Sequence, residues 1–387
     1  MPTRTMLGLA HNRQNAPAPF GIADRDRLAH LYVIGQTGTG KSTLLAQMAR
    51  QDGARGAGLC LIDPHGDLAE TLHATLPQTH LYWDIADPAC RLGYNPLQRV
   101  SPARRPLVAS GLIDTLKKQW PEAWGARMEH LLRHAILALL EEQRADLRDI
   151  MQLFVFKGFR RQVTERLTDP QVRSFWKHEF PALNYQTTAD GISPIANKLG
   201  AFLAHPTVRT ALCEPAEPLR FRRIMDERQI LLVNLAKGRL GADVSNVVGG
   251  VITASLMHAA FSRHDIPPDE RQPFFLYVDE FHNLTTRAFA GLMSEARKYG
   301  LGLTLAHQHL AQTETEVRDA ILGNVGAMLV FRLGPSDAPF FERFLPPFTA
   351  RDLMNQPNYW MAVRMAEAGT RLKPFSATTY SPDQNAA

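Results

Sequence analysis

Short runs of apolar residues recur along the chain, and stretches with helical spacing lie between them. Seven of these runs are rich in Val, Ile, Leu and aromatic residues: 31–34, 59–62, 81–83, 230–235, 274–278, 303–306 and 328–331. Such alternation is typical of an α/β fold. Because the runs lack a polar face, we expect strands buried on both sides in a mostly parallel central sheet. Two further runs, 360–364 and 371–378, flank Gly369 and predict a C-terminal β-hairpin.

A different pattern occupies the middle of the chain. Apolar residues at helical spacing form a stripe over 128–140, and shorter helical patterns follow it. We interpret four prolines as breaks between these patterns: Pro170, Pro181, Pro194 and Pro206. The chain therefore divides into an α/β domain (28–99 and 224–380) and an inserted, mostly helical subdomain (100–223). Outside them, residues 1–27 form an N-terminal extension and 381–387 a loose tail.

A phosphate-binding loop follows the first predicted strand. The segment fits the pattern GxxxxGK[ST] and lies directly before a helical run: Gly35, Gln36, Thr37, Gly38, Thr39, Gly40, Lys41, Ser42 and then Thr43. Its glycines let backbone N–H groups surround phosphates at the positive end of the next helix. Lys41 should bridge the β- and γ-phosphates, and the Ser42 hydroxyl should bind Mg²⁺. The predicted cofactors are ATP and Mg²⁺.

Acidic residues follow two of the predicted strands. Asp279 and Glu280 come directly after 274–278, at the edge of a parallel sheet where ligands bind. Asp279 would hold Mg²⁺ through water, and Glu280 would polarise the attacking water as general base. The pair could instead be a plain strand end or a helix cap, but the phosphate loop favours the catalytic interpretation. Asp63, after the second strand, either assists the metal or caps the next helix.

Three more polar residues have both a catalytic and a structural interpretation. Gln308 lies at a strand tip, where an amide can sense the γ-phosphate or orient water, or can be a simple loop amide. Arg332 ends another strand and is a candidate phosphate contact. Arg297 projects from the last turn of a predicted helix, 286–299, that Gly300 terminates. A cation there also favours the helix dipole.

Five segments in a fixed order carry a family resemblance: LYVIGQTGTGKSTL, CLIDPHGDLAE, FFLYVDEFHNL, SEARKYGLGLTLAHQHLAQ and VFRLGPSDA. Together, over about residues 28–379, they resemble the HerA/FtsK superfamily, above all the motor domain of TraD/TraG-type coupling proteins of conjugation and type IV secretion. The resemblance implies a RecA-like P-loop core with an all-α insertion, assembled as a hexameric ring that pumps DNA through its channel, with ATP between subunits.

The resemblance also implies roles for single residues. The positions that match one subunit's site are Lys41, Ser42, Asp279, Glu280 and Gln308. Arg297 matches the arginine finger that reaches into the neighbour's site. Partners implied by such a motor are DNA, further copies of this chain, and a relaxase or components of a type IV secretion channel.

One departure from the coupling proteins concerns the membrane. They usually begin with membrane-spanning helices, whereas no stretch here approaches the roughly 18 apolar residues that a span needs. The N-terminus also lacks the apolar core of a signal peptide. Three scattered cysteines suit a reducing compartment, and no histidine shows metal-ligand spacing. We expect a cytoplasmic protein, or one held at the inner membrane by a partner.

The charge balance is mildly basic, with 43 Lys and Arg against 38 Asp and Glu, and by itself decides nothing about partners. A channel that moves DNA without regard to sequence should contact phosphates. The candidate contacts are Lys237 and Arg239, with clusters at Arg160–Arg161 and at Arg220, Arg222 and Arg223, although solvated surface charge explains any one cluster as well.

Three other functions stay open on the sequence alone. One is a HerA-like helicase, end-processing or defence motor that works with a nuclease. Another is a protein-secretion ATPase. The last is an assembly module gated by nucleotide, against which Glu280, Gln308 and Arg297 argue, because a binding switch needs neither a general base nor a finger.

Overall fold

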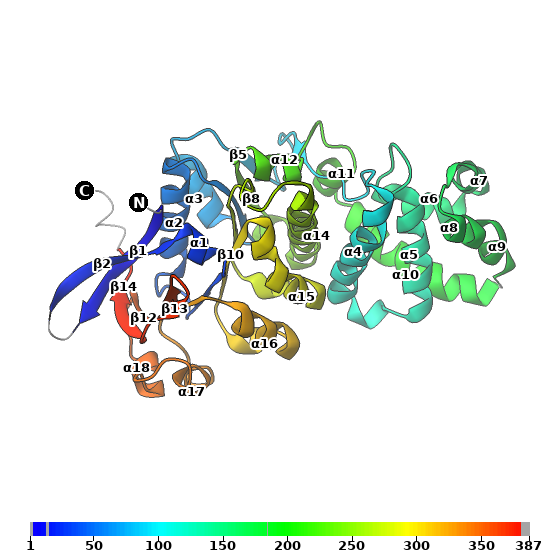
Figure 1. The fold of residues 1–387 in the computed structure, drawn as a ribbon. Coiled ribbons are helices and arrows are strands. Elements are labelled where there is room, and N and C mark those ends of the chain that lie inside the picture. The colour runs from blue at the N-terminus through cyan, green and yellow to red at the C-terminus, as the bar shows by residue number, and fades with distance from the viewer. Residues whose placement is uncertain (1–2, 13–14, 184, 381–387) are drawn as a thin grey trace. The chain divides into compact units, whose positions relative to one another are not determined.

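The computed structural model describes residues 3–12, 15–183 and 185–380, and the chain separates into two compact units. One unit comprises Met1–Tyr82, Phe221–Leu235 and Ala259–Ala387, and the other Trp83–Arg220 and Ala236–His258. Strands dominate the first unit and helices the second (Figure 1). The predicted tail, 381–387, lies outside the described residues.

The large sheet has the strand order β2-β1-β14-β12-β11-β3-β10-β9-β4-β8-β5. Six neighbouring strands, from β11 to β8 in this order, pair in parallel. Every residue of these six is buried, which confirms that strands without a polar face form the parallel centre. The strands that the apolar runs predicted are β3 (Leu31–Ile34), β4 (Gly58–Asp63), β5 (Leu81–Asp84), β8 (Ile230–Asn234), β9 (Phe274–Val278), β10 (Leu301–His307) and β11 (Ala327–Val330).

Antiparallel strands form one margin of the sheet, where β12, β14, β1 and β2 are labelled in Figure 1. The predicted hairpin is present: β12 (Trp360–Glu367) pairs with β13 (Thr370–Arg371) across a turn in which Ala368 and Gly369 both have positive φ. β14 (Phe375–Thr378) pairs with β12 and with β1 (Arg4–Asn12), whose other neighbour is β2 (Asn15–Ala23). The hydrophobic pattern predicted no strand in 1–27, and the structure places two there.

A buried ion pair links this N-terminal segment to the parallel strands. Arg27 closes α1 (Asp24–Arg27), and its guanidinium donates to both carboxylate oxygens of Asp52, at 2.7 and 2.9 Å, and to the Tyr277 hydroxyl at 2.7 Å. Arg27 and Asp52 are almost fully buried, so removal of either would leave an uncompensated charge in the interior. The network joins the N-terminus to the helix after β3 and to β9.

Helices cover both faces of the parallel strands. α2 (Lys41–Ala54) and α3 (Asp67–Thr75) bury their leucines in one core with alternate residues of β3, β4 and β9. α15 (Arg287–Ala296) continues as a 3-10 turn, Arg297–Tyr299, and ends at Gly300 with φ 74°, as predicted. The other helices of this unit are α12 (Phe221–Asp226), α16 (Thr315–Asn324), α17 (Ala338–Glu342) and α18 (Ala350–Met354).

The second unit is mostly helical and also contains a short parallel pair, β6 (Leu92–Gly93) and β7 (Glu217–Pro218). Its helices include α4 (Arg105–Gln119), α5 (Ala126–Leu139), α6 (Leu147–Val155), α7 (Lys157–Arg166), α8 (Pro170–Ser174), α9 (Phe180–Ala182), α10 (Tyr185–Leu203) and α11 (Pro206–Leu212). The predicted apolar stripe is the buried face of α5. Pro170 and Pro206 open helices, where the missing N–H costs nothing. Pro194 lies inside α10, so the expected break there is wrong: packing of α10 against α5 carries the helix past it.

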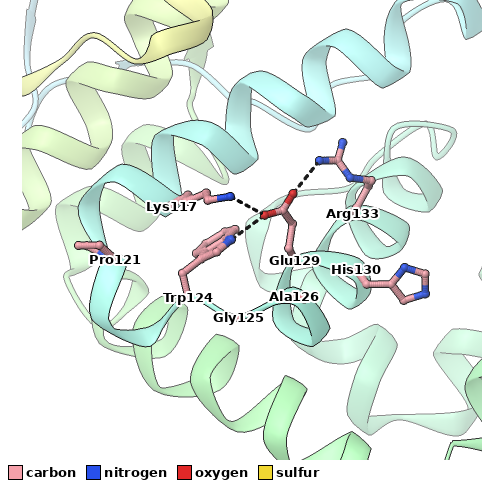
Figure 2. A pocket seen from close by; sticks show the side chains of 8 residues that line it. All are labelled: Lys117, Pro121, Trp124, Gly125, Ala126, Glu129, His130 and Arg133. Carbon is pink, nitrogen blue, oxygen red and sulfur yellow. Dashed lines mark hydrogen bonds and ion pairs between the residues drawn. The ribbon is translucent and has the colours of Figure 1, made fainter. Parts of the chain in front are cut away.

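A polar cavity of about 610 Å³ lies between α4 and α5 (Figure 2). Glu129 occupies its wall and accepts hydrogen bonds from the Trp124 indole at 2.8 Å, Lys117 at 3.1 Å and Arg133 at 3.2 Å. The indole first, then the two cations, lower the pKa of Glu129. Because Glu129 and its three donors are already hydrogen-bonded to one another, we interpret them as a structural cluster. None of the predicted site residues lines this cavity.

One helix of the described chain, Ala242–Asp265, is long and apolar enough to cross a bilayer. It comprises α14 (Ala242–Phe261) and the 3-10 turn that follows. The hydrophobic pattern of the sequence predicted no such stretch. However, 72% of its apolar window is buried within the protein, as in a core helix, so its length and composition are weak evidence for a span.

Candidate nucleotide site

The carboxyl ends of β3, β4, β9 and β10 meet at a cavity of about 1020 Å³ in the first unit. The phosphate loop and α2 form one side of the cavity. Its wall also includes Asp63, Asp279, Glu280, Gln308 and Tyr359. Residues that the chain separates by more than two hundred positions therefore face one space, as expected at the carboxyl edge of a parallel sheet.

The phosphate loop is shaped by two glycines that no other residue could replace without strain. A Cβ on Gly35 would lie 2.5 Å from the Cβ of Phe331, so the loop and the end of β11 pack too closely for a side chain. Gly40 is the N-cap of α2 and has φ 115°, in the left-handed region that favours glycine. The loop thus enters α2 with its backbone N–H groups unblocked by Cβ atoms.

Lys41 is the first residue of α2, and its ammonium folds back over the loop. It donates to the carbonyl oxygens of Gly35 at 2.6 Å and Gln36 at 3.0 Å. Burial lowers the pKa of Lys41, and the negative charges of Asp279 and Glu280 act in the opposite direction. The ammonium therefore lies within electrostatic reach of both carboxylates, at the place where phosphate oxygens would neutralise it.

The acidic pair follows β9 and is nearly buried. Burial first, and then the charges of Asp63 and Glu280, raise the pKa of Asp279 to about 7. Three carboxylates near one another and out of water strongly favour a cation between them and the phosphates. Carboxylate and hydroxyl oxygens are the donors that Mg²⁺ prefers, so Ser42 and Asp279 fit this ion. Among the described residues no group of three His, Cys, Asp or Glu side chains is placed to hold a metal ion by itself.

Glu280 is oriented by contacts with other strands. The Gln308 amide at the tip of β10 donates to Glu280 Oε1 at 2.7 Å, and Thr37 Oγ1 donates to Gln308 Oε1 at 2.8 Å. His282 Nδ1 lies 3.4 Å from the other carboxylate oxygen. Glu280 has φ 45°, in the left-handed region that residues other than glycine seldom adopt, so the surrounding bonds hold it in place. Thr37, Gln308 and Glu280 form one hydrogen-bonded chain across the cavity.

The Asp63 carboxylate has a capping role in the structure. One oxygen accepts from the backbone N–H of His65, and the other accepts from the N–H groups of Leu68 and Ala69, at 2.8–3.1 Å. It therefore supports the first turn of α3. Its charge still reaches Asp279, as the raised pKa of Asp279 shows. Of the two interpretations of Asp63, the cap is visible, and any contribution to the metal acts through charge.

The two predicted arginines lie outside the cavity wall. Arg332 follows β11, and its guanidinium donates to the Gln36 side chain and to the Gln356 carbonyl, each at 3.3 Å. It thus contacts the phosphate loop from the side. Arg297 is exposed on the 3-10 turn after α15 and does not reach the cavity of its own chain. A finger that acts on a neighbouring subunit would be placed in this way.

The structure gives most of the predicted DNA contacts acidic partners. Arg222 pairs with Asp226 and Asp265, at 2.5 and 2.8 Å, and Arg223 pairs with Glu227 at 2.6 Å. In the second unit Arg239 pairs with Asp84 at 2.5 Å. Lys237, the first residue of α13 (Lys237–Leu240), is half-buried. These pairs support a structural role for Arg222, and the DNA-contact hypothesis is weakest there.

The two arginines of the remaining cluster, Arg160 and Arg161, also have local partners. Arg160 donates to the carbonyl oxygens of Leu153 and Phe154 at the end of α6, and Arg161 pairs with Glu165 at 2.8 Å. Arg160 thus satisfies carbonyls that the helix end leaves open.

Sequence reasoning missed Tyr359, which precedes β12 and lines the cavity. Its N–H donates to the Thr39 carbonyl of the phosphate loop at 2.8 Å. No motif includes it, because the contact depends on how the antiparallel margin of the sheet meets the loop. The only available signal was its place directly before the predicted hairpin strand.

Comparisons with solved structures show the fold. The bacterial conjugative coupling protein TrwBdeltaN70, in its unbound form, is 16% identical with a TM-score of 0.66, over 93% of this chain and 86% of that one. TrwB in complex with ADP and Mg²⁺ is 17% identical with a TM-score of 0.64, over 98% and 95%. VirB4 of Thermoanaerobacter pseudethanolicus is 15% identical with a TM-score of 0.62, over 98% of each chain. The chain therefore has the RecA-like P-loop fold with an all-α insertion.

No curated protein matches the chain. Two family models do. The one described as the TraM recognition site of TraD and TraG matches residues 273–344, and the one described as helicase HerA, central domain, matches residues 6–237. Both confirm the resemblance that the five sequence segments carry. Because the HerA model matches more than half of the residues of this chain, the chain belongs to the HerA central-domain family.

Proposed function

We propose that this protein hydrolyses ATP to drive DNA through a ring of identical subunits, as a motor of the type IV coupling-protein kind. The observation that carries the proposal is the convergence of Lys41, Asp279, Glu280 and Gln308 on one cavity beside a phosphate loop. A module that only binds nucleotide needs the loop and the lysine. An oriented carboxylate held by an amide is the further part that hydrolysis requires.

Each residue then has a defined task. The loop N–H groups and Lys41 bind the phosphates, and Lys41 exchanges its carbonyl partners for phosphate oxygens when ATP enters. Ser42 directly and Asp279 through water would hold Mg²⁺, which would supply positive charge against the charge of the phosphates. Glu280 takes the proton of the attacking water, and Gln308 keeps its carboxylate aimed at that water.

Arg297 completes the site of the next subunit in a hexamer. Its exposure and its distance from its own cavity are what a finger acting on a neighbour requires. Arg332 supports the phosphate loop through its hydrogen bond to the Gln36 side chain, and the loop in turn holds the phosphates. In this arrangement 28–99 and 224–380 form the motor domain, and 100–223 the inserted all-α domain. Complexes of TrwB with ADP and Mg²⁺ and with analogues of GTP and ATP support nucleotide and Mg²⁺ as the ligands.

Basic residues that the phosphates of DNA can reach would make the DNA contacts, and Lys237 and Arg239 are our preferred candidates. The match to a model named for TraM recognition in TraD and TraG supports partners from the conjugation machinery, such as a relaxase or a secretion channel. Such a motor works in the cytoplasm or at the inner membrane, where a partner holds it. The match to the HerA central domain favours a second candidate, a DNA-end-processing or helicase motor that works with a nuclease.

The test is the ATPase rate without DNA, with single-stranded DNA and with double-stranded DNA, together with the particle mass with and without nucleotide. A motor gives DNA-stimulated turnover and a hexameric mass, and the stimulation should weaken steeply with salt because it rests on phosphate contacts. Lys41→Ala is the control for contaminating ATPases. Turnover that ignores DNA would contradict the translocase, and a particle that changes mass with nucleotide but does not hydrolyse it would show an assembly module.

A further inference from the structure

Tyr359 has a backbone conformation that bulky residues rarely adopt. Its φ is 69°, in the left-handed region. Two hydrogen bonds hold it there: its N–H donates to Thr39 O at 2.8 Å, and its carbonyl accepts from Thr379 N–H at 2.9 Å. Strained residues that their surroundings hold in place are concentrated at binding sites. This residue is strained at the wall of the nucleotide cavity.

The strain places the aromatic ring beside the start of α2. A Cβ on Gly40 would lie 3.0 Å from the Cδ1 of Tyr359, so the ring lies against the last glycine of the phosphate loop. The ring is half-buried and lines the cavity. Thr379, which follows β14, also donates to Gln47 Oε1 at 3.3 Å and so links the end of β14 to the second turn of α2. The ring therefore borders the space beyond the phosphates, on the side of α2 that faces β14.

Polar side chains on the same side of α2 are already engaged. The Gln47 amide accepts from Thr379 and donates to the Met6 carbonyl at 3.3 Å. Gln51 accepts from the Met6 N–H at 2.7 Å and donates to the Met6 carbonyl at 2.9 Å. Both amides thus hold β1, and neither is available to read the hydrogen-bonding edge of a base. Arg50, which also lines the cavity, donates to the Thr75 hydroxyl at 3.1 Å. The Tyr359 ring offers an aromatic face, and such a face accepts any base.

We propose that the ring of Tyr359 stacks on the nucleobase and that the site does not distinguish adenine from guanine. This inference rests on the proposed nucleotide-binding function and adds the base side of the same site. It predicts a protein that binds purine nucleoside triphosphates by their phosphates and by one stacking contact. Discrimination between bases would require an amide or carboxylate at the base edge, and Gln47 and Gln51 are committed elsewhere.

Equilibrium binding of three probes, ATP, GTP and inorganic tripolyphosphate, tests the proposal. The informative variant is Tyr359→Asn, because Asn tolerates the left-handed conformation and removes the ring without distorting the backbone. We expect it to bind ATP and GTP about tenfold or more weakly, by the same factor, with unchanged affinity for tripolyphosphate. Tyr359→Phe keeps the ring and should behave like the unmodified protein. Melting temperatures without ligand show that each variant is folded.

Each other result overturns a specific claim. Unchanged ATP affinity in Tyr359→Asn removes the stacking role. An equal loss for all three probes shows that the residue only supports the phosphate loop. A strong preference of the unmodified protein for ATP over GTP removes the claim of base indifference. If the unmodified protein binds tripolyphosphate but gains nothing from the base, the phosphate site stands and this inference falls. If it binds none of the probes, the proposed function fails as well.

Discussion

The side-chain amide of Gln308 donates to Glu280 Oε1 over 2.7 Å. The same amide accepts from the Thr37 hydroxyl at 2.8 Å. The phosphate loop, the tip of β10 and the carboxylate after β9 are thereby connected through one amide group. Its carbonyl faces the loop and its NH₂ faces the carboxylate, so a shift of either neighbour must move the other. If Glu280 is the general base of the proposed reaction, this link would let phosphate binding at the loop set the direction of its carboxylate.

Replacement of Glu280 by Gln should separate binding from hydrolysis. Gln retains an oxygen that accepts from Gln308 and keeps the buried volume, but it cannot take a proton from water. We expect unchanged ATP affinity and a turnover lower by about 10²- to 10⁴-fold, the usual contribution of a general base. Binding and single-turnover measurements check this. Turnover at the normal rate would show that another group activates the water.

The hydrogen-bonded chain itself is tested by Gln308→Ala and Thr37→Val. Loss of the amide leaves Glu280 with one fewer donor and free to rotate, so kcat should fall by about tenfold or more with little change in KM. Thr37→Val removes only the far end of the chain and should have a smaller effect in the same direction. A larger effect on KM than on kcat would assign Gln308 to ground-state binding.

Lys41→Ala should weaken ATP binding. The Lys41 ammonium bonds to two loop carbonyls, so the folded loop already holds the charge where phosphates arrive. A charged hydrogen bond contributes roughly 1.5–3 kcal/mol, which corresponds to a loss of about tenfold to 100-fold in affinity. Isothermal titration with a non-hydrolysable ATP analogue measures it. Affinity within twofold of normal would mean that the loop N–H groups alone hold the phosphates.

Residue patterns predicted those parts of the fold and of the candidate site that residue type and spacing determine. They missed the parts that depend on contacts between segments distant in sequence. The apolar runs identify the parallel strands because burial on both faces demands such residues, and the loop motif includes Gly40 because its backbone conformation demands glycine. Gly35 is required because Phe331 packs too closely for a side chain. Tyr359 and the strands β1 and β2 went unpredicted. Tyr359 has a role only through contacts with Thr39 and Thr379, which are distant in sequence. The continuation of α10 through Pro194 likewise depends on packing that spacing does not reveal.

Acid should destabilise the protein through His30. Its Nδ1 accepts from the Leu303 N–H at 3.2 Å while its Nε2 donates to the Met293 carbonyl at 2.9 Å, an arrangement that needs the neutral ring. Burial, above all, lowers the pKa of His30 from 6.5 to about 4. Above pH 6.5 neither state is protonated and no stability is lost. Below it the unfolded chain binds a proton that the folded chain refuses, so stability falls until pH 4.

The size of that effect is about 2 kcal/mol between pH 6.5 and pH 5, at about 1.4 kcal/mol for each pH unit. Urea unfolding at pH 7.5 and at pH 5 measures the difference. His30→Gln keeps a donor and an acceptor but does not titrate, so its unfolding free energy should depend less on pH. An equal pH dependence in the variant would assign the acid sensitivity to other buried groups.

Arg297→Ala tests whether neighbouring subunits share a site. Arg297 is exposed and lies outside the cavity of its own chain, so its loss should leave ATP binding intact and lower turnover by about 10³- to 10⁵-fold if it serves the next subunit. Lys298→Ala, a change of the adjacent exposed cation, is the matched control and should keep normal turnover. Mixing Arg297→Ala with unmodified subunits before assembly should lower activity more than dilution does.

Complementation makes the same test decisive. An Arg297→Ala subunit keeps its own Glu280, and a Glu280→Gln subunit keeps its own Arg297. Each variant is inactive alone because every site in its ring lacks one of the two groups. In a mixed ring, a site that takes Glu280 from one variant and Arg297 from the other is complete, so the mixture should regain part of the turnover. Recovery can occur only if the two residues of one working site come from different chains. A mixture as inactive as its components, in rings of confirmed mixed composition, would place Arg297 outside the neighbour's site and leave the exposed cation to the dipole of α15 alone.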